Sequence, residues 1–265
     1  MAAMTLVVDS HAPAVPADLR LPGLTVVLPC LDEEDNVRPA VAEALAAAEM
    51  CASGVEVVVV DDGSTDATRE RAEALAAVDE RVRVVVHPAN RGYGAAVRSG
   101  IEAARMPWIL LTDGDRQFDL TELVGLLPLA SGHDLVAGYR IDRQDGFGRR
   151  VAGRAWSWLT RRTFGFGVMD VDCAFKLIRT RSVRRIELTS DGAMVSAELL
   201  ARGVRDGWEI AEMGVHHRPR TAGEPSGGDA SVVARAFRER RALLRELRRS
   251  ERQSRTAPQG RLVHH

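Results

Sequence analysis

Cysteine, lysine and long apolar runs are scarce in this chain. The three cysteines, Cys30, Cys51 and Cys173, are odd in number and widely spaced, which excludes a disulfide framework or a cysteine-rich zinc site. No apolar run approaches the ~20 residues that a membrane-spanning helix needs. The N-terminus lacks the charged start and continuous apolar centre of a signal peptide. These absences together predict a cytoplasmic protein.

Lys176 is the sole lysine, so arginine carries nearly all of the positive charge. The formal net charge of −1 gives no reason to expect a nucleic acid as partner. Hydrophobic residues make up 45% of the 265 residues, which is enough to bury one large core or two small ones.

Apolar, β-branched runs alternate with helical segments through the first half of the chain. The expected strands cover residues 24–28, 55–60, 81–86 and 108–111, and Pro29 is expected to end the first of them. Helices are expected between successive strands, and this alternation predicts an α/β fold with a parallel sheet and right-handed crossovers. Beyond residue 115 the pattern is looser, with expected strands at 134–138 and 208–215 and expected helices at 120–127, 151–164 and 193–201.

Acidic turns follow several of these strands. Asp113 and Asp115 come just after the apolar run 108–111 and are separated by one glycine. Carboxylates at the carboxyl end of a buried strand are well placed to bind a hard cation, which they share with substrate phosphates. Taken alone, Asp-Gly-Asp is more typical of a polar turn. Because other acidic turns lie at the same expected sheet edge, we interpret it as a metal–diphosphate site.

Glycine-rich phosphate-binding loops are missing at the expected places. The turn after the first strand, residues 29–33, contains no glycine, and Gly92-Tyr93-Gly94 lacks the third glycine of a dinucleotide-binding loop. A Walker loop is absent as well. Phosphate binding is therefore expected to depend on a metal ion and on arginine.

Seven segments, in this order and spacing, resemble glycosyltransferase family 2, and within it the dolichol- and polyprenyl-phosphate sugar transferases. The segments are residues 27–34, 60–66, 90–94, 113–117, 138–140, 170–176 and 220–226. The resemblance implies a GT-A fold, which is a Rossmann-like three-layer sandwich with a mostly parallel central sheet and a C-terminal amphipathic helix. It also implies metal-dependent, inverting transfer of a hexose, mannose or glucose, from a nucleotide-diphosphate sugar to polyprenyl or dolichyl phosphate. GDP-mannose is the favoured donor, with a UDP-sugar as the alternative.

The resemblance implies three groups of site residues. Those for the nucleotide base and ribose are Pro29, Leu31, Glu33 and either Asp61 or Asp62, with Arg91 and Gly92 nearby. Those for Mg²⁺ or Mn²⁺ and the donor diphosphate are Asp113, Gly114, Asp115 and Gln117. Those that meet phosphate groups during catalysis are Arg140 and Arg220.

The chemistry of the acceptor decides whether a general base is needed. A phosphate acceptor is already anionic and needs positioning by cations, which His216, His217, Arg218 and Arg220 would supply. A hydroxyl acceptor needs a base within hydrogen-bond reach, and Glu198 is the candidate. A third interpretation is a non-catalytic nucleotide-sugar-binding protein. Asp170 and Asp172 are expected to brace their segment rather than to act in catalysis.

We expect a flexible leader over residues 1–22, the catalytic domain over 23–230, a basic amphipathic helix over 231–250 and a disordered tail over 251–265. The helix carries an apolar stripe among many arginines, a pattern typical of helices that lie on anionic membrane surfaces. The protein is then peripheral on the inner face of the plasma membrane. Alternatively, the stripe packs on its own domain or on a second copy in a homodimer.

Overall fold

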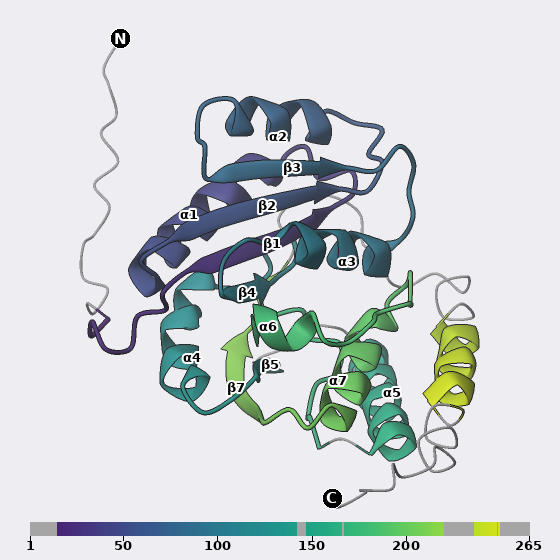
Figure 1. Ribbon diagram of the computed structural model, residues 1–265. Helices are drawn as coiled ribbons and strands as arrows, with labels where there is room; N and C mark the ends of the chain where they lie inside the picture. Colours follow the sequence, from purple (N-terminus) through teal and green to yellow (C-terminus); the bar gives the residue numbers. More distant parts are fainter. Residues whose placement is uncertain (1–14, 142–146, 166, 220–235, 248, 250–265) are drawn as a thin grey trace, which may run out of the picture.

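The computed structural model describes residues 15–141, 147–165, 167–219, 236–247 and 249. These residues form a seven-stranded sheet in the order β3-β2-β1-β4-β6-β5-β7, with helices on both faces (Figure 1). All strand pairs are parallel except those made by β6. The predicted three-layer arrangement with a mostly parallel sheet is confirmed.

The first half of the chain alternates strands and helices as expected. Its elements are β1 Leu24–Cys30, α1 Val37–Cys51, β2 Val55–Asp61, α2 Thr68–Ala76, β3 Val82–Val86, α3 Tyr93–Ala103 and β4 Trp108–Leu111. β2 is almost entirely valine because helices cover both of its faces, as is usual for parallel strands. The prediction that Pro29 ends the first strand is wrong, since Pro29 pairs with Val60 inside β1.

The second half contains one strand that the sequence pattern did not reveal. Its elements are the 3-10 turn η1 Leu120–Glu122, α4 Leu123–Ala130, β5 Leu135–Ile141, α5 Phe147–Phe164, β6 Lys176–Arg179, α6 Thr180–Val183, α7 Val195–Arg205 and β7 Ile210–His216. The strand β6 is four residues long and runs antiparallel to both β4 and β5. A run this short carries too little periodicity to be distinguished from a loop.

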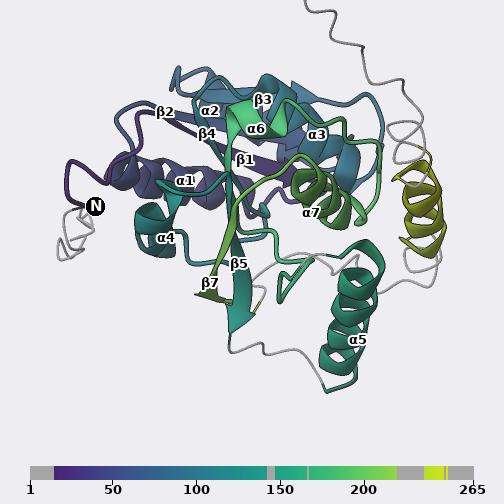
Figure 2. The same cartoon turned by 60° about the horizontal axis from the view of Figure 1, so that its bottom comes forward.

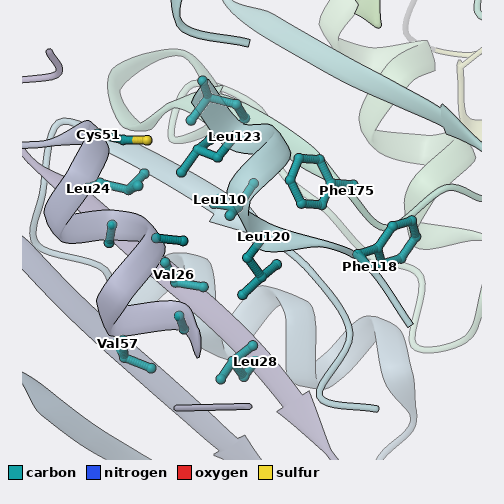
Figure 3. Close-up of a cluster of buried hydrophobic side chains, with 14 of the residues drawn as sticks. Leu24, Val26, Leu28, Cys51, Val57, Leu110, Phe118, Leu120, Leu123 and Phe175 are labelled. Carbon is teal, nitrogen blue, oxygen red and sulfur yellow. The ribbon is translucent and has the colours of Figure 1, made fainter. Parts of the chain in front are cut away.

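The core lies on both faces of the sheet. On one face, Leu24, Val26 and Leu28 of β1 contact the layer formed by α1 and α4 (Figure 3). On the other face, Val27 belongs to a second cluster that α3 and α7 cover. The alternation follows the two-residue period of a strand. Burial on both sides leaves only the strand ends open to a ligand.

The folded domain begins earlier than predicted. Leu21 is buried and pairs with Ala52, and the Arg20 guanidinium donates hydrogen bonds to the carbonyl oxygens of Met50 and Ala52. The predicted leader, residues 1–22, is therefore too long at its C-terminal end. Residues 1–14 and the predicted tail, 251–265, lie outside the described residues.

Residues 236–247 form a helix, within the range predicted for the basic amphipathic helix. The helix lies beside α5 in both views (Figure 1 and Figure 2), and Arg240 donates a 2.5 Å hydrogen bond to Thr163 at the end of α5. Its apolar residues Leu243 and Leu247 are buried against the domain. The expectation that this stripe faces a membrane is therefore wrong, and the alternative, packing on its own domain, is correct.

The opposite face of this helix remains exposed, and its arginines are Arg238, Arg241, Arg245 and Arg249. Within the described residues, no helix combines the length and the hydropathy needed to cross a bilayer.

Candidate functional site

The predicted site residues gather at the carboxyl ends of β1, β2 and β4. β1 lies between β2 and β4, so the strand order reverses there, and ligands of open α/β sheets bind at such a reversal. Cys30, the last residue of β1, lies among them. Burial raises the pKa of its thiol, and the charges of Glu33, Asp61, Asp113 and Asp115 raise it further. These four carboxylates therefore lie near enough to the end of β1 for their charges to act on Cys30.

Reciprocal hydrogen bonds join the loop after β1 to the loop after β2. The backbone N–H of Thr65 donates to the Asp32 carboxylate at 2.7 Å, and the Asp32 N–H donates to the Ser64 hydroxyl at 3.0 Å. The Glu33 N–H donates to the hydroxyl of Thr68 at 2.7 Å. The two loops are thus held together as one unit.

The predicted nucleotide residues of the first loop differ in burial. Pro29 and Leu31 are half-buried, whereas Glu33 is buried and accepts a 2.6 Å hydrogen bond from the side chain of Asn36.

The two aspartates at the end of β2 have different surroundings. Asp62 accepts hydrogen bonds from the backbone N–H groups of Arg91 at 3.0 Å and Gly92 at 2.8 Å, and its Oδ1 lies 2.5 Å from Nδ1 of His87. It holds the turn before α3. Asp61 is also buried and accepts the Ser64 N–H at 3.2 Å. The exposed side chain of Arg91 lies on the turn that Asp62 holds.

Asp113 and Asp115 follow β4, where the sequence predicted a metal site. Burial raises the pKa of Asp113 to about 6, and the neighbouring charge of Asp115 contributes to this rise. A hydrogen bond from the Tyr93 hydroxyl and the charges of Arg140 and Lys176 act in the opposite direction. Burial, more than charge repulsion, is thus the main reason why this carboxyl holds its proton more tightly than an exposed one.

Gly114 allows this turn to pack against the end of β1. A Cβ at this position would lie 2.7 Å from Sγ of Cys30 and 3.2 Å from the carbonyl oxygen of Pro29. Arg116, two residues further on, has a positive φ of 61°, and its guanidinium Nε donates to Glu43 of α1 at 3.0 Å. Arg116 therefore pairs away from the two aspartates.

Gln117 connects the acidic turn to the segment after β7. Its N–H donates to Asp115 at 3.1 Å, and its carbonyl oxygen accepts the Arg218 N–H at 2.7 Å. Its side-chain nitrogen donates to the Arg218 carbonyl oxygen at 3.1 Å, so Oε1 is the side-chain atom left for a cation. Arg220 lies just beyond this segment, outside the described residues.

Two of the side chains expected to bind a phosphate acceptor are already paired with carboxylates. His216 pairs with Glu122, and Arg218 pairs with Asp119. The His217 ring packs edge-on against Phe118, with 5.2 Å between ring centroids. These contacts attach the segment to the acidic turn, so the expectation that His216 and Arg218 serve as phosphate ligands is not supported.

Arg140 is bonded to Asp170 through two nitrogens. Its Nε and Nη2 donate to the carboxylate at 2.7 and 2.9 Å. Burial opposes the charge of Arg140, but the carboxylate raises its pKa above the ordinary value. Asp170 thus braces this region, as predicted. Lys176 is buried nearby and donates to the carbonyl oxygens of Val171 and Cys173.

Within the described residues there is no cluster of three or more His, Cys, Asp or Glu side chains suited to a metal ion. A cation at Asp113 and Asp115 would take its remaining ligands from Gln117, substrate phosphates and water.

A family model supplies the decisive comparison. The model described as "Glycosyl transferase family 2" matches residues 25–186, more than half of the chain, including β1 to β6 and the acidic turn. The chain belongs to this family. Glycosyl transfer is therefore its class of reaction.

Its relatives include polyprenyl-phosphate sugar transferases. An uncharacterised family glycosyltransferase of Mycobacterium tuberculosis is 36% identical over 219 residues, 76% of this chain and 88% of its own. A dodecaprenyl-phosphate galacturonate synthase of Rhizobium johnstonii is 31% identical over 81% of this chain. An undecaprenyl-phosphate 4-deoxy-4-formamido-L-arabinose transferase of Shewanella sediminis is 30% identical over 81%. The matches span 63% and 64% of these two proteins. The predicted resemblance is confirmed.

Solved structures confirm the GT-A-like α/β fold. Glucosyl-3-phosphoglycerate synthase from Mycobacterium tuberculosis, in complex with Mn²⁺, UDP and phosphoglyceric acid, aligns with a TM-score of 0.66 at 22% identity, covering 84% of this chain and 78% of that one. A second mycobacterial protein aligns with a TM-score of 0.63 at 23% identity, covering 81% and 71%.

Glu198, the predicted base for a hydroxyl acceptor, is completely buried on α7. It accepts hydrogen bonds from the N–H groups of Thr189 and Ser190 at 3.0 and 2.7 Å, and from Nε of Arg202 at 2.8 Å. Burial raises its pKa, but these hydrogen bonds outweigh burial and leave the pKa below the ordinary value. Such a carboxylate is a poor proton acceptor, so the structure argues against Glu198 as general base in this family 2 enzyme.

Tyr93 is the site residue that sequence reasoning missed. Its place between two glycines was noted only for the phosphate-loop question, and the pattern gave no sign that burial and the charge of Asp113, twenty residues later, would raise the pKa of its hydroxyl.

Proposed function

We propose that the protein transfers a sugar from a nucleotide-diphosphate sugar to a polyprenyl phosphate, with Mg²⁺ or Mn²⁺ bound at Asp113 and Asp115. The observation that carries the proposal is this acidic pair at the strand-order reversal, within the stretch that matches the family. The named activities of relatives that act on dodecaprenyl and undecaprenyl phosphates support the acceptor.

The residues at the acidic turn fit a divalent cation. Asp113 and Asp115 follow β4 with one glycine between them, and they are close enough for the charge of Asp115 to raise the pKa of Asp113. A dication bound there would neutralise both carboxylates. Two carboxylates and one amide oxygen leave coordination positions for phosphate oxygens, which Mg²⁺ commonly shares with its protein ligands. When bound, the cation supplies Lewis-acid stabilisation of the charge that develops on the leaving diphosphate.

The chain's own residues orient the donor. We assign the base and ribose to the joined loops after β1 and β2, with Asp61 as the acidic contact. Arg140 is close enough to Asp113 for its charge to lower that pKa, and it would add positive potential near the diphosphate. Arg220 is proposed as a second phosphate contact. Guanidinium groups suit this role because their planar fork matches phosphate oxygens.

The environment of Glu198 favours a phosphate acceptor over a hydroxyl acceptor. An anionic phosphate needs no general base, and the one carboxylate proposed as base for a hydroxyl acceptor is buried and fully engaged. Direct attack by the acceptor phosphate opposite the leaving diphosphate inverts the anomeric carbon. A product with the anomeric configuration of the donor would contradict this mechanism.

The exposed arginines of the 236–247 helix, including Arg238, Arg241 and Arg245, are proposed to face an anionic membrane that holds the acceptor. Each arginine near such a surface contributes about 1 kcal/mol, and salt screens this attraction. Co-sedimentation with anionic vesicles should therefore occur at low salt and be lost at high salt. Absence of binding at low salt would remove this part of the proposal.

Turnover assays test the proposed function. GDP-mannose, UDP-glucose and UDP-galacturonate are each offered with undecaprenyl phosphate or a simple alcohol, in Mg²⁺, Mn²⁺ or EDTA. We expect one donor to react with the lipid phosphate only, and only with metal. Asp115→Asn should abolish turnover, whereas Asp79→Asn, before β3 at the opposite sheet edge, should retain it. Nucleotide binding without turnover by any donor would instead indicate a binding protein.

A further inference from the structure

His87, directly after β3, is a buried residue whose two ring nitrogens both have partners. Nδ1 lies 2.5 Å from Oδ1 of Asp62, which is also buried, and Nε2 lies 2.9 Å from the hydroxyl oxygen of Ser99 on α3. An ionised carboxylate has no proton to give, so Nδ1 donates to Asp62, and with that one ring proton in place Nε2 accepts the Ser99 hydroxyl. The ring therefore links the end of β2 to α3.

Asp62 places the turn before α3. Its Oδ1 accepts the N–H of Arg91 at 3.0 Å as well as the His87 proton, and its Oδ2 accepts the N–H of Gly92 at 2.8 Å. Each oxygen binds a different backbone N–H, so the orientation of the carboxylate plane matters. The bond from His87 restricts rotation of that plane. His87 thus acts on the turn through Asp62.

The backbone around His87 fixes the ring in front of Asp62. Its N–H donates to the carbonyl oxygen of Asp61 at 2.9 Å, which continues the pairing of β3 with β2. Beyond His87 the chain passes close to Gly63, where a Cβ would lie 2.4 Å from the carbonyl carbon of Ala89. The loops after β2 and β3 are therefore in direct contact.

The loop that follows Asp62 also contacts the loop after β1, where the proposed function places the base and ribose. The N–H of Thr65 donates to the Asp32 carboxylate at 2.7 Å. Hydrogen bonds thus join the loops after β1, β2 and β3 in series. Arg91, a predicted nucleotide residue with an exposed side chain, lies on the third loop. A displaced turn would change the position of Arg91 relative to the first two loops.

We propose that His87 is a positioning residue for the nucleotide. Acting through Asp62, it fixes the 91–92 turn, and with it Arg91, beside the loops after β1 and β2. Ser99 supports the ring from the side of α3. The proposal rests on the proposed binding of a nucleotide sugar at these loops.

Nucleotide binding by two substitutions of His87 tests the proposal. The amide nitrogen of asparagine takes the place of Nδ1, whereas the amide group of glutamine extends to the place of Nε2. UDP and GDP are each titrated into the full chain by calorimetry, with and without Mn²⁺. His87→Asn should keep the affinity within about 3-fold, and His87→Gln should lower it about 10-fold or more, the typical effect of losing a hydrogen bond to a charged group. His133→Gln, before β5 at the opposite sheet edge, should bind as the wild type does.

Kinetics and thermal unfolding separate positioning from a purely structural role. Each His87 variant loses one buried hydrogen bond, so their unfolding temperatures should fall by similar amounts, and a difference in affinity then reports on the bond to Asp62. In turnover, His87→Gln should raise the KM for the donor about as much as it weakens nucleotide binding, with a smaller change in kcat.

Equal nucleotide affinity in the two His87 variants would overturn the inference and leave the proposed function intact. A lower kcat at unchanged KM would overturn it as well. If His87→Gln does not fold, His87→Asn decides alone: wild-type affinity supports the inference, and a loss of about 10-fold, despite the retained donor to Asp62, overturns it. A wild type that binds neither UDP nor GDP, with or without Mn²⁺, would overturn both proposals.

Discussion

Replacement of Glu198 should destabilise the fold rather than remove a catalytic base. The side chain is completely buried, and its carboxylate accepts hydrogen bonds from the N–H groups of Thr189 and Ser190 and from Arg202. In Glu198→Ala these donors lose their acceptor where water has no access. The 189–192 loop then loses its main attachment to α7.

The expected cost follows from these contacts. A buried donor left without an acceptor costs about 1–3 kcal/mol, and breaking a buried charge pair costs about 3–5 kcal/mol. Arg202 is 14% exposed and keeps Glu246 as a partner at 2.6 Å, so its share falls at the low end. We expect the free energy of unfolding to fall by about 3–5 kcal/mol. At about 2–4 °C per kcal/mol for a domain of this size, the unfolding temperature falls by roughly 6–20 °C.

The pH dependence gives a second measure. Because hydrogen bonds hold the pKa of Glu198 below its ordinary value, its ionisation stabilises the fold above the unfolded pKa of about 4.3. That stabilisation is lost as the pH falls through the lower, folded value. Glu198→Gln lacks it at every pH, so the difference in unfolding temperature from the wild type should shrink below about pH 4. A Glu198→Gln variant that unfolds like the wild type but has lost transfer to alcohols would refute this reasoning and identify Glu198 as a base.

Three further predictions concern packing. Gly94→Ala should cost about 1–3 kcal/mol of stability and slow turnover, because its Cβ would overlap the carbonyl oxygen of Ser190; normal turnover would contradict that contact. Leu243→Ala should cost about 2–5 kcal/mol in thermal unfolding, whereas Phe237→Ala, at a side chain 39% exposed, should change stability by less than about 0.5 kcal/mol; the reverse order would mean that the helix does not dock as described. Burial raises the pKa of Cys173 to about 11 and covers the other two cysteines, so a thiol reagent at pH 8 should react only after unfolding; rapid labelling of native protein would contradict this burial.

The first half of the fold was predictable because its signals are local. A valine-rich run followed by an acidic turn marks both a strand and the position where it ends, as at β2 and Asp61. Pro29 misled the prediction for a physical reason. β4 ends opposite Val27, so at Pro29 β1 has β2 as its one strand neighbour, and a missing N–H need not cost a ladder hydrogen bond.

The contacts that complete the site were not predictable, because they join residues far apart in sequence. Asp62 sets where α3 begins because it accepts the N–H groups of Arg91 and Gly92, about thirty residues later in the chain. Asp170, thirty residues after Arg140, forms an ion pair with the guanidinium that was expected to contact phosphate. In both cases the residue types suggested contact with a ligand. Only the folded structure shows that these charged groups already have partners within the protein.

The C-terminal helix shows why amphipathic patterns do not identify their partner. A stripe containing Leu243 and Leu247 predicts that one face is buried, and a bilayer or a protein surface satisfies it equally. Polar contacts at its edges decide between them: Glu239 accepts the Gly192 N–H at 3.1 Å, and Glu246 pairs with Arg202. Carboxylates that meet specific donors on the domain would be unpaired on an anionic membrane. Because Gly192 belongs to the loop that packs against Gly94, the helix also supports the start of α3, next to the predicted nucleotide residues Arg91 and Gly92. Loss of the helix should therefore affect the site even if it never touches a substrate.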